Sequence, residues 1–225
     1  MYDYIVSGSA GYLGKTLVEF LEQKGNVVLS LDIQTGFDLN KSEVVERIFQ
    51  ENKARNLINL FALNDKVEES GFRSTFLDLD LEDFRRTLEV NVTSLFSVCR
   101  EFIRNNTQGN IVNFSSIYGV RSPDPRLYGS GEKPISYGVS KAAVLQLSRH
   151  LATHAAPDFR VNSIVLGGVF ENQHESFIHD YSLKVPLARM GNPEDIQEAV
   201  LFLTSESSTY VTGSAVYIDG GFSSW

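Results

Sequence analysis

Hydrophobic residues along this chain gather in short runs, and segments with a different pattern separate the runs. The apolar runs have the length of buried strands and lie at residues 4–6, 27–32, 56–63, 109–116, 158–166 and 211–218. Elsewhere apolar residues recur every three or four positions, a period typical of helices, at residues 15–24 and 42–54, from 81 onward and after 192. Because strands and helices alternate, the pattern predicts an α/β fold with a Rossmann-like, doubly wound parallel sheet. No repeat or linker divides the chain, so residues 1–225 are expected to form a single domain.

The longest expected helix begins near Leu81. Its apolar stripe, with steps of three and four residues, consists of Phe84, Leu88, Val92, Leu95, Cys99 and Phe102. Cys99 lies within this stripe and is interpreted as a core residue. Asn91 lies one position off the stripe, at its edge. The polar residues 65–81 carry no clear period, and we expect them to form a loop.

The connection after the second expected strand is short. Residues 33–36 are too few for a helix, and residues 37–39 are expected to belong to the next strand. Parallel neighbours normally need a crossover of about a dozen residues, so we expect this connection to be unusually tight or the local pairing to be irregular. Asn40 or Ser42 then follows as a candidate cap for the helix that runs to about Ala54.

Charge and composition argue against several classes of partner. The chain has 225 residues, 42% of them hydrophobic, and a net charge of −8. No run of Lys or Arg offers a surface for nucleic acid. No apolar run approaches the ~20 residues that span a bilayer, and the N-terminus carries no basic and apolar leader. Cys99 is the only cysteine. We therefore expect a cytoplasmic protein with neither nucleic acid nor membrane as a partner.

A glycine-rich turn follows the first expected strand. Gly8, Gly11 and Gly14 stand between this strand and the helix after it. Glycines let a ligand approach the backbone closely, and the first amides of a helix suit a pyrophosphate. Asp32 closes the second expected strand, about where a dinucleotide fold places an acid that accepts the ribose hydroxyls and repels a 2′-phosphate. The sequence therefore predicts an NAD site, with NADP less favoured.

A second motif pairs Tyr137 with Lys141. Four residues are little more than one helical turn, so on a helix the two side chains share a face. An adjacent ammonium is expected to lower the pKa of a tyrosine from its ordinary value of about 10, which would make the pair an acid/base device. The strand at residues 109–116 ends in two hydroxyls, the second that of Ser116, at the kind of strand end where parallel sheets build their sites.

Over essentially its whole length, the sequence resembles the short-chain dehydrogenase/reductase family. The motifs that carry the resemblance are residues 7–14, Asn91, Ser116, Tyr137 with Lys141, Arg160-Val161-Asn162, residues 210–213 and Asp219-Gly220-Gly221. The resemblance implies that Tyr137 is the proton donor or acceptor and that Ser116 orients the reacting oxygen. It further implies that Lys141 holds the nicotinamide ribose and that Asn91 maintains a proton-relay water.

The resemblance also implies a set of cofactor contacts. Those residues are Gly8, Gly11, Tyr12, Leu13, Gly14, Asp32, Asp38, Leu39, Ala62, Tyr137, Lys141, Gly167 and Val169. The implied activity interconverts a secondary alcohol and a ketone on a small polar, sugar-like substrate, without a metal. The implied assembly is a homodimer or homotetramer built on the long helices near Asp80 and Tyr137 and on the C-terminal segment.

Several positions depart from the family pattern. The glycine spacing G-x-x-G-x-x-G is similar to that of the extended branch, whereas the length and the C-terminal motifs resemble the classical branch. The strand-end motif reads Asn59-Leu60-Phe61-Ala62, Leu166 stands at the usual proline, and Glu171 stands near the threonine that meets the cofactor's carboxamide. These changes concern the cofactor site and leave the four catalytic residues intact. They favour, as alternatives, a sugar-nucleotide epimerase or dehydratase, or a nucleotide-sensing protein without turnover.

Ser116 and Tyr137 are 21 positions apart, more than is usual in the family. The insertion carries charges and aromatic residues, which suit a polyhydroxylated or anionic substrate, or else it is a solvated loop. It also resembles a bacterial subgroup acting in flagellin or surface-glycan pathways. His150 and His154 have a spacing that could bind zinc but no third ligand, so we interpret them as surface residues. His174 and His179 could reach the substrate from a lid.

Overall fold

Parallel strands form one sheet in the order β2-β1-β3-β4-β5-β6 in the computed structural model, which describes residues 1–64, 76–128 and 131–225. Within these residues the strands are β1 (Tyr2–Ser7), β2 (Val28–Leu31), β3 (Ala54–Asn59), β4 (Gly109–Ser116), β5 (Phe159–Leu166) and β6 (Ala215–Ile218). Every neighbouring pair is parallel. The chain reverses direction along the sheet between β2 and β3, which makes the sheet doubly wound and confirms the expected fold.

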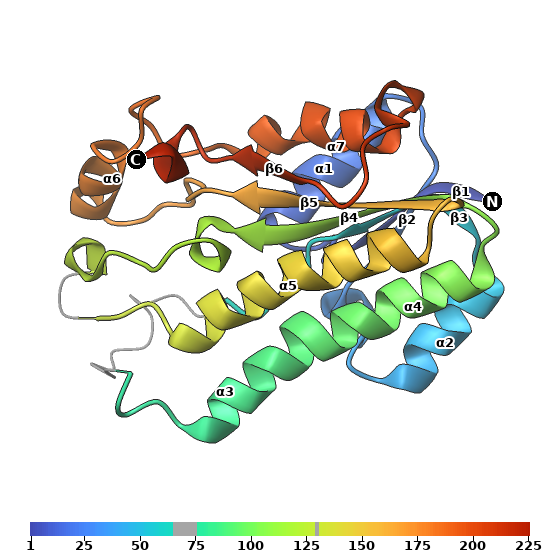
Figure 1. Cartoon of the computed structure of the whole chain (residues 1–225), viewed down its shortest axis with the longest axis horizontal. Helices are drawn as coiled ribbons and strands as arrows, with labels where there is room; N and C mark the ends of the chain where they lie inside the picture. The colour runs from blue at the N-terminus through green and yellow to red at the C-terminus, as the bar shows by residue number, and fades with distance from the viewer. Residues whose placement is uncertain (65–75, 129–130) are drawn as a thin grey trace.

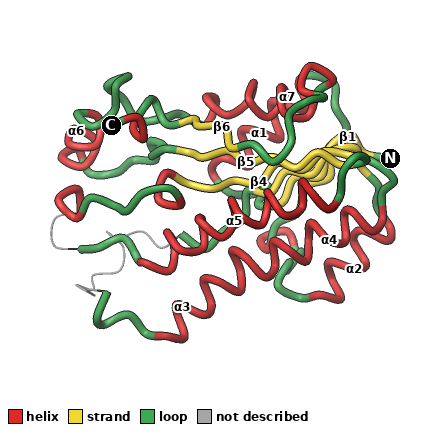
Figure 2. The backbone as a smooth tube through the Cα atoms, in the orientation of Figure 1, coloured by secondary structure: helices red, strands yellow, loops and turns green. Residues whose placement is uncertain are grey.

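Helices cover both faces of the sheet. The described residues contain α1 (Tyr12–Gln23), α2 (Ser42–Glu51), α3 (Leu81–Leu88), α4 (Leu95–Asn105), α5 (Ile135–His154), α6 (Glu175–Ser182) and α7 (Gln197–Thr204). Figure 1 shows α1 and α7 on one face and α2, α4 and α5 on the other. The loops that follow the strands gather at one end of the molecule (green in Figure 2). In the part of the chain described, no helix is long and apolar enough to cross a membrane.

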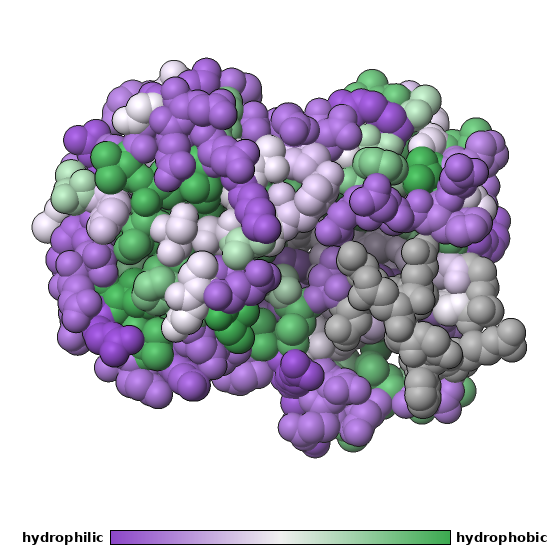
Figure 3. All heavy atoms as spheres, turned by 180° about the vertical axis from the view of Figure 1, so that it is seen from behind, coloured by the Kyte–Doolittle hydropathy of each residue, from purple (hydrophilic) through white to green (hydrophobic). Residues whose placement is uncertain are grey.

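Alternate residues of β1, β3 and β4 pack into two separate cores. Successive side chains of a strand point to opposite faces, so adjacent residues pack against different helices. The core beneath α2, α4 and α5 contains Ile5, Leu57 and Ile111. The core beneath α1 and α7 contains Val6, Ile58 and Val112. Seen from behind, the molecule is hollowed between its two ends, and hydrophobic residues gather on the end that carries the N-terminal strand (Figure 3).

The strand expected at residues 37–39 was a wrong prediction. Asp32 instead caps a single 3-10 turn, Ile33–Thr35, and Gly36 follows in the left-handed region with a φ of +91°. Leu39 is buried in the core without pairing to any described strand. The expected tight crossover therefore does not exist. A single helix, α2, carries the chain from β2 past β1 to β3, and β2 is the last strand at its edge of the sheet.

Several element boundaries also differ from the expected ones. Lys41, and neither Asn40 nor Ser42, occupies the cap position of α2, and it makes no side-chain capping bond. The amide oxygen of Asn40 accepts a hydrogen bond from the Ser94 hydroxyl at 2.7 Å instead. Residue 54 opens β3 rather than closing the helix, because its backbone pairs with β1. The last strand covers only the second half of residues 211–218.

The expected long helix is divided by a wider π-helical turn, Glu89–Ser94, between α3 and α4. The extra residue in this turn shifts the buried face, so Asn91 lies inside with only 3% of its surface exposed, not at the edge of a stripe. Cys99 and Phe102 lie in the core as predicted. Of the expected loop at 65–81, residues 65–75 lie outside the described residues.

Buried polar side chains join the middle strands below the carboxyl end of the sheet. The hydroxyl of Ser7 donates to the amide oxygen of Asn59 at 2.8 Å, and the amide nitrogen of Asn59 donates to Asn113 at 2.8 Å. The amide nitrogen of Asn113 in turn donates to the Ser148 hydroxyl of α5 at 2.9 Å. Buried polar groups require such partners, so this chain of bonds fixes β1, β3, β4 and α5 in one register.

Replacing Phe102 with alanine should lower the free energy of unfolding by about 3–5 kcal/mol. The Phe102 ring is fully buried and meets Phe49 and Phe159 edge to face, so alanine leaves a cavity between α4 and the sheet. Phe202→Ala, at a ring that is 45% exposed, is the control and should cost clearly less. The measurement is equilibrium unfolding in denaturant. Equal losses in the two variants would contradict this account of the core.

Candidate active site

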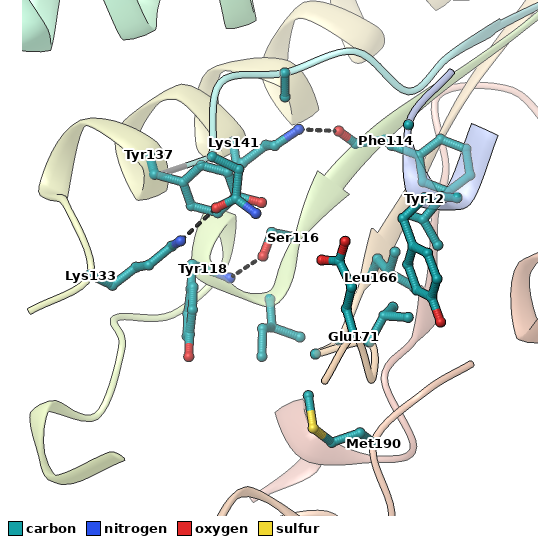
Figure 4. Close-up of a pocket in the computed structure, with 18 of the residues that line it drawn as sticks. Tyr12, Phe114, Ser116, Tyr118, Lys133, Tyr137, Lys141, Leu166, Glu171 and Met190 are labelled. Atoms are coloured by element: carbon teal, nitrogen blue, oxygen red, sulfur yellow. Dashed lines mark hydrogen bonds between the residues drawn. The ribbon is translucent and has the colours of Figure 1, made fainter. Parts of the chain in front are cut away.

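A cavity of about 530 Å³ opens at the carboxyl ends of β1, β3, β4 and β5. One side is the glycine turn, and the opposite side is formed by the insertion before α5 and by residues around α6. Figure 4 shows Ser116 and Tyr137 at its centre, with Tyr12 toward one end and Lys133 toward the other. Of the residues that the sequence singled out, those brought to this cavity include Gly8, Gly11, Tyr12, Leu13, Gly14, Leu60, Ala62, Ser116, Tyr137, Lys141, Leu166, Gly167, Val169 and Glu171.

The glycine turn is shaped by close backbone contacts. Gly8 has a φ of +77°, and a Cβ there would lie 2.5 Å from the backbone nitrogen of Phe61. A Cβ on Gly14 would lie 2.1 Å from the carbonyl oxygen of Gly8, so α1 packs directly on the turn. The first turn of α1 contains no acid and Gly11 supplies no capping side chain. Its leading amides, those of Tyr12 and Leu13, thus suit a pyrophosphate, and this end of the cavity fits a dinucleotide.

Asp32 lies beside the glycine turn rather than in the cavity wall. Its carboxylate accepts hydrogen bonds from the backbone nitrogens of Ala10 at 3.0 Å and Gln34 at 2.9 Å. The side chain is therefore held at the carboxyl end of β2, where an acid can meet a ribose. Asp38 and Leu39 are not brought to the cavity. Asp38 accepts from the backbone of Asn40, and Leu39 is in the core.

Three of the expected catalytic side chains meet in the cavity. Tyr137, in the first turns of α5, lines the cavity with Ser116 at the end of β4, and the Ser116 hydroxyl influences the pKa of its phenol. The ammonium of Lys141 donates to the carbonyl oxygen of Phe114 at 2.9 Å and lies 5.7 Å from the centroid of the Tyr137 ring. A hydroxyl, a phenol and an ammonium thus lie close together, and the phenol can donate or accept a proton there.

Burial raises the pKa of Tyr137 to about 12, although the neighbouring Ser116 hydroxyl acts to lower this pKa. Burial also lowers the pKa of Lys141 to about 8. The expected lowering of the tyrosine pKa by Lys141 was therefore wrong for the cofactor-free protein. The reason is geometric: the ammonium faces the Phe114 carbonyl and the ring rather than the phenolic oxygen. Tyr137 is consequently a neutral phenol near pH 7 and is able to donate a proton.

Asn91 acts on the site from behind the cavity wall. Its amide oxygen accepts from the backbone nitrogen of Leu63 at 2.7 Å, and its amide nitrogen donates to the Leu63 carbonyl at 3.0 Å. The same nitrogen is 3.0 Å from the hydroxyl of Ser140, which donates to the Tyr137 carbonyl at 2.7 Å. Asn91 therefore joins the loop after β3 to the start of α5. The relay role that the resemblance implies for it stays a prediction.

The insertion between Ser116 and Tyr137 forms part of the cavity wall. Tyr118 and Tyr128 are hydrogen-bonded through their hydroxyls, and both line the cavity. The ammonium of Lys133 lies 4.8 Å from the centroid of the Tyr137 ring and donates to the side-chain oxygen of Asn64 at 2.5 Å. The insertion thus contributes to the site, as its aromatic and charged residues suggested.

A salt bridge ties the insertion to the segment after α6. The carboxylate of Asp124 lies 2.7 Å from the ammonium of Lys184 and 2.8 Å from the guanidinium of Arg126. These two cations, first Arg126 and then Lys184, hold the pKa of Asp124 far below its usual range. The two segments that cover the substrate end of the cavity are therefore linked to each other.

The residues after β5 contribute different side chains from those expected. Glu171, Gln173, Phe177 and Tyr181 line the cavity. His174 and His179 are both exposed outside it, so their expected approach to the substrate is not seen. Phe177 and Tyr181 were not among the residues expected at the site. The available signal for them in the sequence was their spacing of four residues, because this spacing places both rings on one face of α6.

The other histidine pair is part of a helix end. The rings of His150 and His154 are stacked, and the ring nitrogen Nδ1 of His154 lies 2.8 Å from the carbonyl oxygen of His150. Residues 1–64, 76–128 and 131–225 contain no group of three His, Cys, Asp or Glu side chains that could hold a metal. The cavity residues that carry chemistry are hydroxyls, ammoniums and a carboxylate.

Comparisons with known proteins identify the family. A family model described as "Enoyl-(Acyl carrier protein) reductase" matches residues 10–223. A glucose 1-dehydrogenase from Gluconobacter oxydans (strain 621H) is 34% identical over 84% of this chain and 71% of its own length. The chain belongs to the short-chain dehydrogenase/reductase family. It is therefore an NAD(P)-dependent oxidoreductase acting on CH–OH groups.

Two further relatives support the same assignment. Glucose 1-dehydrogenase 2 from Bacillus subtilis (strain 168) is 28% identical over 96% of this chain and 93% of its own. A short-chain dehydrogenase from Leptospira borgpetersenii serovar Hardjo-bovis, solved with bound NAD+, is 33% identical and superposes with a TM-score of 0.89 over 99% of this chain and 94% of its own. These relatives give no support to the narrower resemblance to flagellin and surface-glycan enzymes.

In the cofactor-free protein, Tyr137 should remain un-ionised up to about pH 10, because burial raises its pKa to about 12. The measurement is the difference in phenolate absorbance between the native chain and Tyr137→Phe during an alkaline titration. In denaturant the same difference should titrate near the ordinary value of about 10. A native midpoint below 10 would show that Lys141 controls the phenol after all.

Proposed function

We propose that this protein interconverts a secondary alcohol and a ketone on a small polyhydroxylated, sugar-like substrate, with NAD(H) as its cofactor. The observation that carries the proposal is that Ser116 and Tyr137 line one cavity with two different ends, with the Ser116 hydroxyl close enough to act on the pKa of the phenol. One end is the glycine turn, which suits a dinucleotide. The other end is lined by side chains able to hold a polar molecule.

The substrate end of the cavity favours a ligand with several hydroxyls. Its wall includes the side chains of Asn64, Lys133 and Gln173, which offer hydrogen-bond donors and acceptors. The rings of Tyr118 and Tyr128 supply flat apolar surface beside them. Sugars present both hydroxyls and apolar ring faces, so this mixture suits them. The relatives named glucose 1-dehydrogenase support the same substrate class.

The reaction transfers a proton to or from the reacting oxygen in step with the transfer of a hydride. When bound, the nicotinamide cofactor donates or accepts that hydride. Tyr137 gives its proton to the carbonyl oxygen during reduction and takes one from the hydroxyl during oxidation. The hydroxyl of Ser116 donates a hydrogen bond to the same oxygen and stabilises its developing charge. The Lys141 ammonium adds positive charge beside the phenol, at 5.7 Å from the ring centroid.

Asp32 is the basis for proposing NAD rather than NADP. Its carboxylate is fixed by the backbone of Ala10 and Gln34 at the end of β2, beside the turn that suits the pyrophosphate. An ionised acid at this place repels a 2′-phosphate and accepts the hydroxyls of an unmodified ribose. The shortened connection, Ile33–Thr35, contains no arginine that could compensate the phosphate charge.

We expect NADH to bind more tightly than NADPH. Asp32→Asn should lower the ratio of the NADPH to the NADH dissociation constant by about tenfold, because a neighbouring charge changes such equilibria by that order. Asparagine keeps one acceptor, for the Ala10 amide, and loses the second one, which accepts from Gln34. Fluorescence titration of both reduced cofactors at moderate salt measures the ratio. Equal or tighter binding of NADPH to the native protein would exclude the proposed preference.

Tyr137→Phe should reduce turnover by about 10²–10⁴-fold, the contribution of a positioned acid or base. The aromatic ring is kept and only the proton carrier is lost, so cofactor affinity should change little. Activity is followed as cofactor oxidation or reduction with a panel of aldoses, polyols and keto-sugars. Because relatives named 3-oxoacyl-[acyl-carrier-protein] reductase also match this chain, an acetoacetyl thioester completes the panel.

Tyr210→Phe is the matched control, because this tyrosine is exposed and remote from the cavity wall. It should leave turnover unchanged. Near-normal turnover in Tyr137→Phe on the best substrate would refute the assigned mechanism. Reaction with the thioester alone would exclude the sugar-like substrate, and cofactor binding without turnover on any substrate would favour a nucleotide-sensing protein.

A further inference from the structure

Glu171 places a carboxylate in the middle of the cavity wall. It follows β5 by five residues and lines the cavity together with Leu166 and Val169. In Figure 4 its carboxylate points into the cavity, on the side of Ser116 that faces Leu166 and Tyr12, whereas Tyr137 and Lys133 lie beyond Ser116 in the other direction. Glu171 is thus positioned between the glycine turn and the acid/base pair.

This interval is where the reactive ring of a nicotinamide cofactor must lie. The amides at the start of α1 suit the pyrophosphate, and the carbon that exchanges the hydride has to come close to the substrate carbon beside Ser116 and Tyr137. The nicotinamide end of a bound cofactor would therefore lie along the wall that contains Glu171. The ammonium of Lys133 lies at the Tyr137 ring, farther from the glycine turn, and that of Lys141 is directed to the carbonyl oxygen of Phe114.

A carboxylate at this position distinguishes the two oxidation states of the cofactor. The nicotinamide ring carries a positive charge when oxidised and none when reduced, and a nearby anion stabilises only the charged form. We propose that the carboxylate of Glu171 raises the affinity for NAD+ relative to NADH. The proposal rests on the proposed function, because it requires NAD(H) to occupy this cavity. It also gives a role to a residue that departs from the threonine of the family pattern.

The test measures the binding of NAD+ and of NADH separately by calorimetry, with the native chain of 225 residues and three variants. Glu171→Gln keeps the shape and removes the charge, whereas Glu171→Asp keeps the charge. Glu175→Gln removes the same charge from an exposed position in the first turn of α6 and is the matched control. No substrate is present, so the readout is independent of turnover.

In Glu171→Gln the affinity for NAD+ should fall about tenfold relative to the affinity for NADH, the size of effect that an opposite charge at about 4–6 Å exerts on a titrating group. The midpoint potential of the bound couple would then rise by about 30 mV, since a tenfold change in equilibrium corresponds to that value for two electrons. Glu171→Asp should keep most of the preference, and Glu175→Gln should leave the ratio unchanged.

An unchanged ratio in Glu171→Gln, with both nucleotides still bound, would overturn the inference and leave the proposed function intact. A parallel loss of affinity for both nucleotides would show an ordinary binding contact and overturn it equally. If the native chain bound neither nucleotide, the proposed function would fail together with the inference. A Glu171→Gln protein that does not fold is detected by its circular dichroism, and Glu171→Asp and Glu171→Thr then supply the charged and neutral members of the comparison.

Discussion

Hydrogen bonds between β4 and α5 fix the geometry on which the site depends. The hydroxyl of Ser115 donates to the backbone carbonyl of Lys141 at 2.7 Å, and the ammonium of Lys141 donates to the carbonyl of Phe114 at 2.9 Å. Two turns further along the helix, Ser148 accepts from Asn113. These bonds fix the position of α5 along β4. As a result, Tyr137 lies beside Ser116. Gly119 permits the close approach, because a Cβ there would lie 2.7 Å from the Lys141 carbonyl.

The same burial that fixes the site sets its charges. Moving an ammonium out of water costs several kcal/mol, and a single carbonyl partner does not offset all of this for Lys141, whose pKa is lowered to about 8. The phenol of Tyr137 responds to burial in the opposite direction, with a raised pKa. The site therefore favours the neutral phenol, while a cation lies beside its ring and a carboxylate, that of Glu171, lies across the cavity.

The shortened edge of the sheet concentrates several functions in Asp32. In the Rossmann order 3-2-1-4-5-6 a further strand lies outside the second one, whereas here β2 is the edge strand and a 3-10 turn follows it. The Asp32 carboxylate caps that turn and also holds the glycine turn through Ala10. One buried acid thus supports both loops on this side of the cofactor-binding end, and its negative charge is the basis of the proposed preference for NAD.

The sequence alone determined the features that depend on local spacing. The period of the apolar residues predicted alternating strands and helices, Gly8, Gly11 and Gly14 predicted the turn, and parallel strands have to bring their carboxyl ends to one edge. Tertiary structure decided what depends on packing between distant segments. Asn91 entered the interior through a π-helical turn, and Leu39 became core without a strand, because the packing of neighbouring elements overrides local pattern. The direction of the Tyr137 pKa and the position of Glu171 likewise follow from burial and from how loops fold over the cavity, neither of which residue spacing encodes.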